Sequence, residues 1–288
     1  MRLLLEGLVD YAGLFPPAAL SMRESVANYA AYRESAHRKM LGRFVLPVSR
    51  LAEFARDATE AAHGAPWPLA ALATESDASA IAEFNTANSA RFYVDTIEAK
   101  AVTSAEVVAL SSAYPAMHVY VEIPVATDPA PLIEAIGAVR LRAKIRTGGI
   151  SADAFPAPAD VLRFLQRCAE HHVAFKATAG LHHPVRGSYK LTYAADAPSG
   201  VMYGYLNVFL AAALLFHGVS GADVLPLLEE RDARSITSSA DGIAWRGHHL
   251  SSAQVAQARA KFAGSFGSCS FEEPVNDLAA LHLLPESL

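Results

Sequence analysis

The sequence predicts a single-domain (β/α)8 barrel, and three observations lead to this fold class. Short apolar runs alternate with helix-like stretches from one end of the 288-residue chain to the other. The apolar runs lack a strict polar–apolar alternation, which is typical of parallel strands that are covered on both faces. There are eight such runs with helical segments between them, which is the number that a closed barrel needs.

The expected elements follow one another in a regular order along the chain. The helical stretches place apolar residues at three- and four-residue spacing, and a last helix is expected at 274–284. The expected strands occupy 3–12, 43–49, 68–74, 90–97, 117–125, 141–148, 173–180 and 261–269. The intervening helices are expected within 22–36, 50–62, 77–88, 104–114, 129–139, 158–172 and 206–216.

Two segments interrupt this alternation. Residues 186–200 are polar and rich in small residues, so we expect a mobile loop after the seventh strand. Residues 234–250 resemble an inserted hairpin before the last strand, with its turn at Asp241-Gly242. A doubly wound open sheet is the competing fold, but no G-x-G-x-x-G follows the first strand and no Walker phosphate loop occurs.

The composition excludes several classes of protein. The chain is 52% hydrophobic and 18% charged, which excludes intrinsic disorder. Its net charge of −5, without a polybasic run, predicts no nucleic-acid or anionic-membrane partner. No apolar stretch reaches the roughly 18–20 residues of a membrane-spanning helix. The two cysteines, Cys168 and Cys269, make no disulfide framework, which indicates a cytoplasmic protein. The aromatic run 202–209 is expected in the core or in the interface of a homo-oligomer.

Charged side chains at the predicted strand ends are the candidate site residues, because barrel enzymes place their chemistry there. The chain has only six lysines, yet Lys144 and Lys176 lie within apolar runs one strand apart. If both side chains point into the barrel, repulsion and burial lower the pKa of each lysine. Such a lysine can form a Schiff base with a carbonyl, and Asp95 or Glu122 could then move protons.

KIRTGG (144–149), FKATAGLHHP (175–184) and FGSCS (266–270) resemble segments of the deoxyribose-phosphate aldolases, which are class I aldolases. KIRTGG (144–149) fits the sixth-strand pattern Lys-x-x-Thr-Gly, and FKATAGLHHP (175–184) is similar to the seventh-strand pattern around the second lysine. FGSCS (266–270) resembles the eighth-strand segment, and the first, second and fourth strands are loosely similar. The resemblance implies that Lys144 forms the imine, that Lys176 lowers its pKa, and that Asp95 assists proton transfer.

Departures from the family pattern change the expected substrate. The Gly-Gly after the second lysine is Ala179-Gly180, and Glu272 and Glu273 stand where the family binds phosphate. Carboxylates at a helix N-terminus repel phosphate, so we expect a small unphosphorylated carbonyl compound, or an acid met by Arg146 and Arg186. The expected substrate-binding residues are Asp10, Arg146, Thr147, Thr178, Gly180, His182, His183 and Ser268.

Two alternatives to an aldolase-type lyase without a cofactor stay open. In the first, Glu122, Asp95 and His182 or His183 hold a divalent metal ion that stabilises an enolate in a lyase or isomerase. No H-x-H, H-E-x-x-H or C-x-x-C pattern points to a particular metal. In the second, the barrel is a non-catalytic binding protein whose lysines form structural ion pairs.

Overall fold

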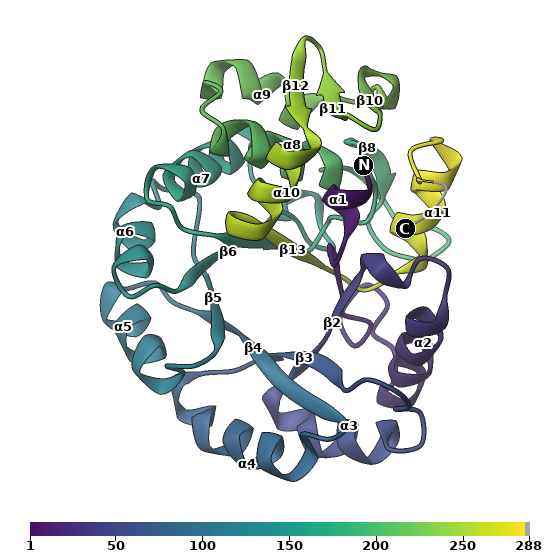
Figure 1. Cartoon of the computed structure of the whole chain (residues 1–288), viewed down its shortest axis with the longest axis vertical. Coiled ribbons are helices and arrows are strands. Elements are labelled where there is room, and N and C mark those ends of the chain that lie inside the picture. Colours follow the sequence, from purple (N-terminus) through teal and green to yellow (C-terminus); the bar gives the residue numbers. More distant parts are fainter. Residues whose placement is uncertain (286–288) are drawn as a thin grey trace.

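Eight parallel strands close into a barrel in the computed structural model, which describes residues 1–285. Figure 1 shows the strands as an inner ring that the helices surround, so the predicted (β/α)8 barrel is confirmed. Around the barrel the strand order is β1-β13-β7-β6-β5-β4-β3-β2. The strands are β1 (Val9–Tyr11), β2 (Leu41–Pro47), β3 (Trp67–Leu72), β4 (Phe92–Lys100), β5 (His118–Glu122), β6 (Arg142–Arg146), β7 (Phe175–Thr178) and β13 (Ala263–Ser268).

Helices connect successive strands on the outside of the ring. Several begin at side-chain caps; Ser21, for example, forms a capping box with Glu24 at the start of α2. The α-helices are α1 (Arg2–Leu5), α2 (Met22–Glu34), α3 (Leu51–Ala58), α4 (Ala78–Asn88), α5 (Ser104–Ala113), α6 (Ala130–Ala138), α7 (Pro158–Glu170), α8 (Tyr205–Phe216), α9 (Gly221–Glu229), α10 (Ser252–Lys261) and α11 (Glu272–Ala280). Short 3-10 helices occupy η1 (Arg38–Met40), η2 (Val48–Arg50), η3 (Glu75–Asp77), η4 (Ala152–Ala154) and η5 (Ala233–Ser235).

The hydrophobic core lies between the outer face of the barrel and the helices. On one side Phe44, Phe54, Trp67 and Phe92 pack edge-to-face or tilted with ring centroids 5.0–6.4 Å apart. On the other side α8 is buried from Tyr205 through Leu215, because it lies under α9 and α10 as well as against the barrel. The aromatic run at 202–209 is therefore part of the core.

The segment between β7 and β13 is longer than a simple helical connection. Within the expected loop 186–200, the structure has an antiparallel hairpin of β8 (Gly187–Lys190) and β9 (Ser199–Met202). The expected hairpin at 234–250 is a three-stranded antiparallel sheet of β10 (Ile236–Ser238), β11 (Gly242–Trp245) and β12 (His248–Ser251). Figure 1 shows this sheet at the edge of the molecule, beyond the ring and next to α9.

The strand ends differ by a few residues from the expected ranges, and two of these differences matter most. The expected first strand at 3–12 is the short helix α1 followed by the three residues of β1, because Gly7 adopts a left-handed φ of +58° between them. The fourth strand extends to Lys100 rather than ending at residue 97, and this extension determines which acidic residue reaches the site.

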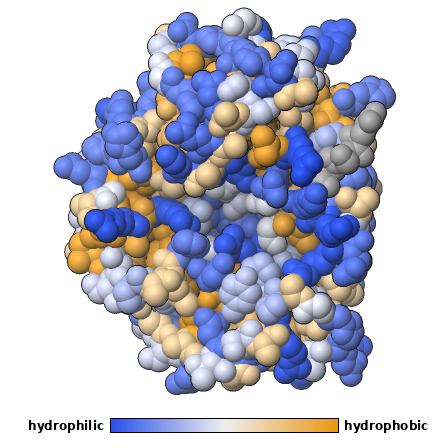
Figure 2. Space-filling model, in the orientation of Figure 1, coloured by the Kyte–Doolittle hydropathy of each residue, from blue (hydrophilic) through white to orange (hydrophobic). Residues whose placement is uncertain are grey.

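The surface is mostly hydrophilic, as Figure 2 shows for one face of the molecule. Within residues 1–285, no helix has the length and hydrophobicity needed to span a membrane. Charged side chains are also present inside the barrel, among them Asp10, Glu98, Lys144 and Lys176, all of which are buried. Buried charges are costly unless they are paired, so their partners identify where chemistry is concentrated.

Candidate active site

A cavity of about 690 Å³ opens at the carboxyl ends of the barrel strands. The loops after the strands and the β8–β9 hairpin complete its wall. This is the mouth at which barrel enzymes carry their active sites. The final residues of six consecutive strands all line the cavity: Pro47, Leu72, Lys100, Glu122, Arg146 and Thr178.

The two strand lysines meet at the floor of this cavity. Lys144 and Lys176 are direct partners across the β6–β7 pairing, so their side chains lie on the same face of the barrel wall. Glu98 bridges them: its Oε2 lies 2.7 Å from Lys144 Nζ, and its Oε1 lies 2.5 Å from Lys176 Nζ. Lys144 Nζ is also 2.9 Å from Glu122 Oε2. Both lysines therefore point into the barrel, which is the condition that the imine hypothesis set.

Only one of the two amines is accessible from the cavity. Lys144 and Glu122 line it, with side chains 7% and 12% exposed. Lys176 has no exposed side-chain surface and does not line the cavity. An incoming molecule can therefore reach the amine of Lys144, whereas the charge of Lys176 acts from behind it.

The carboxylates change the electrostatics that two neighbouring lysines alone would create. Burial raises the pKa of Glu98, but attraction to Lys144 and Lys176 outweighs it and lowers this pKa to about 2. Burial lowers the pKa of Lys176, but attraction to Asp10 and Glu98 outweighs it and raises this pKa above the ordinary lysine value. The expectation of a depressed pKa is therefore wrong for Lys176, because two carboxylates balance its charge.

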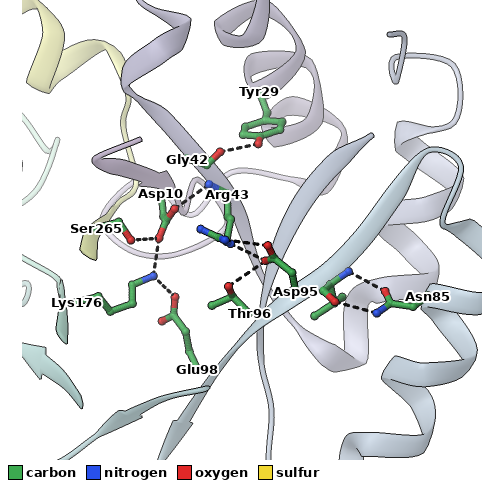
Figure 3. A network of polar contacts seen from close by, with 11 residues as sticks. Asp10, Tyr29, Gly42, Arg43, Asn85, Asp95, Thr96, Glu98, Lys176 and Ser265 are labelled. Carbon is green, nitrogen blue, oxygen red and sulfur yellow. Dashed lines mark hydrogen bonds and ion pairs between the residues drawn. The ribbon is translucent and has the colours of Figure 1, made fainter. Parts of the chain in front are cut away.

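Asp10 holds Lys176 in place, as Figure 3 shows. Its Oδ2 accepts hydrogen bonds from Lys176 Nζ at 2.6 Å and from Ser265 Oγ at 2.5 Å. Its Oδ1 accepts a hydrogen bond from the backbone N–H of Arg43 at 2.7 Å. Asp10 was expected to bind substrate, but it is buried and does not line the cavity. Its contacts make it a positioning residue that joins β1, β2, β7 and β13.

Asp95 lies outside the lysine centre, which corrects its expected position. Arg43 binds its carboxylate through two hydrogen bonds of 2.6 and 2.8 Å, and Figure 3 shows this pair apart from Lys176. The physical reason is an irregularity in β4: Leu69 pairs with Val94 and Ala70 with Thr96, so Asp95 is an extra residue without a partner in β3. Glu98, three residues further along the same apolar run, takes the place expected for Asp95.

The other expected binding residues divide into two groups. Arg146, Thr178, Gly180, His182 and His183 all line the cavity.

Thr147 and Ser268 are buried and lie outside the cavity wall. Thr147 Oγ1 donates a hydrogen bond of 2.7 Å to the carbonyl of Ala179, which ties together the loops after β6 and β7. Arg186, considered as a partner for an acidic substrate, lies 4.5 Å from the ring centroid of Tyr203 and is likewise outside the wall.

The two rim histidines are each paired with a carboxylate of α11. His183 Nδ1 is 2.6 Å from Asp277 Oδ2, and its ring stacks on Tyr189 of β8. His182 Nδ1 lies 3.1 Å from Glu273 Oε2, outside hydrogen-bond geometry. Burial raises the pKa of Glu273, but the contact with His182 outweighs it and leaves this pKa below its ordinary value.

The ligand set proposed for a metal ion is not assembled in the structure. Glu122 pairs with Lys144, Asp95 pairs with Arg43, and the two histidines face α11. Across residues 1–285, no three His, Cys, Asp or Glu side chains form a group that could hold a metal ion. The strand positions alone could not reveal this, because the partner of each side chain depends on the packed barrel.

Tyr193 lines the cavity and has no role predicted from sequence. Tyr193, which follows β8, donates a hydrogen bond of 3.0 Å to Glu273, and its hydroxyl lies 3.6 Å from Cys269 Sγ. Burial raises the pKa of the Cys269 thiol, so it is not an activated nucleophile. The one available signal was that residues 186–200 follow the seventh strand, where loops of barrel enzymes cover the site.

Comparisons with known proteins do not assign a function, so function is inferred from the geometry of the site. A scan against protein-family models and a search of curated proteins both find no match to this chain. The arrangement of Lys144, Glu98, Glu122 and Lys176 at the floor of a cavity is therefore the basis for inferring function.

Proposed function

We propose that this protein is a class I aldolase-type lyase that acts on a small carbonyl compound through an imine on Lys144. One observation carries the proposal. Lys144 presents its amine to a cavity of about 690 Å³ while two carboxylates, Glu98 and Glu122, lie within 3 Å of that amine. The resemblance of the flanking strand motifs to deoxyribose-phosphate aldolases supports the same chemistry.

The reaction proceeds through a covalent link between enzyme and substrate. The neutral Lys144 amine adds to the carbonyl carbon, and the carbonyl oxygen leaves as water to give an iminium ion. In the cleavage direction, a base takes the proton of the β-hydroxyl group. The bond between Cα and Cβ breaks, its electron pair moves to the iminium nitrogen, and an aldehyde leaves. Protonation of the resulting enamine at Cα and hydrolysis of the imine restore Lys144.

The two carboxylates have different roles in this proposal. Glu122 is the proton carrier, because it lines the cavity and its Oε2 lies 2.9 Å from the reacting nitrogen. Glu98 stays ionised, because its pKa of about 2 makes it a weak base at neutral pH. It stabilises the positive iminium charge and connects Lys144 to Lys176, which acts as a positioning residue.

The charge of the cavity favours a substrate without a strong charge of its own. The basic side chains in the wall are Lys100, Lys144, Arg146 and Lys190, and the wall also contains the carboxylates of Glu75, Asp77, Glu98, Glu122 and Glu273. The two sets nearly cancel, so the cavity does not attract a phosphorylated sugar. Apolar side chains such as Val48, Leu72 and Leu191 complete the wall. A polar, uncharged hydroxyaldehyde or hydroxyketone fits these surroundings.

Reductive trapping tests the proposal. The protein is incubated with a panel of aldehydes, ketones and keto acids in the presence of borohydride, and tryptic peptides are analysed by mass spectrometry. We expect an adduct on the peptide that contains Lys144, and none in the Lys144→Met variant. Lys190→Met is the matched control, because Lys190 also lines the cavity but bonds only to the carbonyl of Ala195 in the hairpin.

Two outcomes contradict the proposal. One is the absence of an adduct at Lys144 across the whole panel. The other is equal labelling of Lys100, Lys144 and Lys190, since that indicates unspecific modification of accessible amines.

A non-catalytic binding barrel is the second candidate function. The ion pairs of both lysines with Glu98 are the observation that favours it, because structural lysines are paired in this way. The trapping experiment separates the two candidates, since a purely structural Lys144 forms no imine.

A further inference from the structure

A second cavity, of about 470 Å³, lies at the amino ends of the barrel strands. Its wall is built from the segments that lead into β6, β7 and β13, together with Tyr120 of β5. The lysine centre opens at the carboxyl ends of the same strands, so this cavity is at the opposite mouth of the barrel. It shares no lining residue with the first cavity.

Positive charge dominates this second mouth. The permanent cations in its wall are Arg140, Arg142, Arg259 and Lys261, and His171 and His172 are adjacent. Among residues 1–285, no aspartate or glutamate lines this wall. This concentration is unusual for a chain whose net charge is −5, and it contrasts with the balanced charges of the first cavity.

In the described part of the chain, these four basic side chains have no carboxylate partner. Within residues 1–285, no ion pair involves Arg140, Arg142, Arg259 or Lys261. Arg259 is held by the backbone carbonyls of Ala263 and Glu6, but its Nε is buried and has no hydrogen-bond partner in the described part of the chain. Burial lowers the pKa of Arg259 to about 10, which is the expected response of a guanidinium that lacks an anion.

Helix dipoles do not account for this charge. Helices α6, α7 and α10 end at the segments that line this mouth, and each carries about half a negative charge at its C-terminus. Together they offset well under half of four full positive charges. Arg142 moreover lies on strand β6 and not at the end of a helix, so no helix dipole offsets its charge.

Two of the basic residues also hold strained backbone positions. Arg140 and His172 follow the ends of α6 and α7 with φ of +57° and +54°, in the left-handed region that favours glycine. Each therefore carries backbone strain that glycine would not have at the same place. Basic side chains thus occupy two equivalent turns whose backbone conformation favours glycine.

We propose that this second mouth binds a small molecule carrying two or more phosphoryl groups. Guanidinium groups match phosphate oxygens with paired hydrogen bonds, and three of the four permanent cations are arginines. A volume of about 470 Å³ is within the range of small-molecule sites.

The proposed site is independent of the imine chemistry. The two cavities share no lining residue, and Tyr120 lies next to both centres: the guanidinium carbon of Arg142 lies 5.4 Å from its ring centroid and Lys176 Nζ lies 5.5 Å from it. A ligand at the second mouth therefore does not occupy the space next to Lys144. A variant that has lost imine formation at Lys144 can therefore still be tested for ligand binding at the second mouth, and a variant that has lost this binding can still be tested for imine formation.

Calorimetric titration with tripolyphosphate at low ionic strength tests this site. We expect saturable binding at one site per chain, weakened about tenfold or more in the double variant Arg140→Ala, Lys261→Ala. The matched control is Arg23→Ala, Lys39→Ala, which removes the same two residue types from exposed positions outside both cavities. This control should retain the affinity of the unmodified protein. Thermal unfolding establishes that both variants are folded.

Three results overturn the proposal. The first is the absence of saturable tripolyphosphate binding to the unmodified protein. The second is an equal loss of affinity in the two double variants, which indicates general attraction to positive charge. The third is citrate binding as tightly as tripolyphosphate, which removes the preference for phosphoryl groups.

Discussion

At the scale of single residues, Glu98 organises the centre by using its two oxygens for two different lysines. Lys144 retains access to the cavity, whereas Lys176 is enclosed by Glu98 and Asp10. Three carboxylates therefore surround two ammonium groups, and the centre remains slightly negative when Lys144 is charged. An iminium ion on Lys144 carries its positive charge at the same nitrogen, where the same carboxylates stabilise it.

The stability of the protein should depend on the ionisation of Glu98. Its pKa is about 2 in the folded protein against an ordinary value of 4.5. A carboxylate with a lowered pKa stabilises the fold above the unfolded-state pKa, and this contribution disappears as the pH falls through the folded-state pKa. We therefore expect the contribution of Glu98 to the free energy of unfolding to fall by on the order of 3 kcal/mol between pH 5 and pH 2. Urea unfolding at several pH values measures it.

The control for this prediction is a glutamate on the surface. Glu98→Gln should be less stable at neutral pH, but its stability should fall less steeply between pH 5 and pH 2. Glu83→Gln, at an exposed position of α4, should keep the slope of the unmodified protein. Identical slopes for all three proteins would contradict the assignment.

At the scale of elements, the barrel strands position the chemistry through register and length. The irregularity at Asp95 changes which side chains of β4 face inward, and the extension to Lys100 places Glu98 near the cavity. The alternation of strands and helices could be predicted from sequence, because each run carries its own apolar pattern. The irregularity could not be predicted, because it depends on how β4 pairs with β3.

The loop after β7 contains Gly180, which is predicted from the sequence only as a substrate-binding residue. Gly180 has a φ of +73°, and a Cβ there would lie 2.8 Å from the ring of Phe155 and 3.0 Å from the Cα of Gly148. Glycine is thus needed both for its backbone conformation and for the close approach of the β6 and β7 loops.

A pair of alanine substitutions separates these two requirements. Gly64→Ala is strained by its φ of +76° alone, since nothing lies within 4 Å of the added Cβ. It should cost about 1 kcal/mol of unfolding free energy. Gly180→Ala adds overpacking against Phe155 and should cost about 1–3 kcal/mol more. Chemical denaturation of the two variants measures the difference, and equal costs would show that the loops can move apart.

At the scale of the whole molecule, one barrel separates two mouths with different charge. The mouth at the carboxyl ends of the strands contains both basic side chains and carboxylates, whereas the mouth at the amino ends, as formed by residues 1–285, contains basic side chains and no carboxylate. The net charge of −5 describes neither mouth, because the barrel gathers side chains that are far apart in sequence. The two proposed activities should therefore respond differently to salt.

Raising the ionic strength from 0.1 M to 1 M shortens the screening length from about 10 Å to about 3 Å. We expect the affinity for tripolyphosphate to fall about tenfold or more over this range, because it depends on uncompensated charge. The rate of borohydride trapping with an uncharged hydroxyaldehyde should change less than about twofold. Both quantities can be measured on the same preparation, and equal salt dependence would contradict the distinction between the mouths.

The sequence by itself determined the barrel, the position of the two lysines on neighbouring strands, and the inserted antiparallel segment before the last strand. These features follow from local patterns: apolar periodicity, a two-residue strand repeat and turn-forming residues. The tertiary structure alone decided that Glu98 rather than Asp95 joins the lysines, that Asp10 anchors Lys176, and that the rim histidines face α11. Contacts of this kind join residues up to 166 positions apart, so they depend on barrel closure and strand register, which no local pattern encodes.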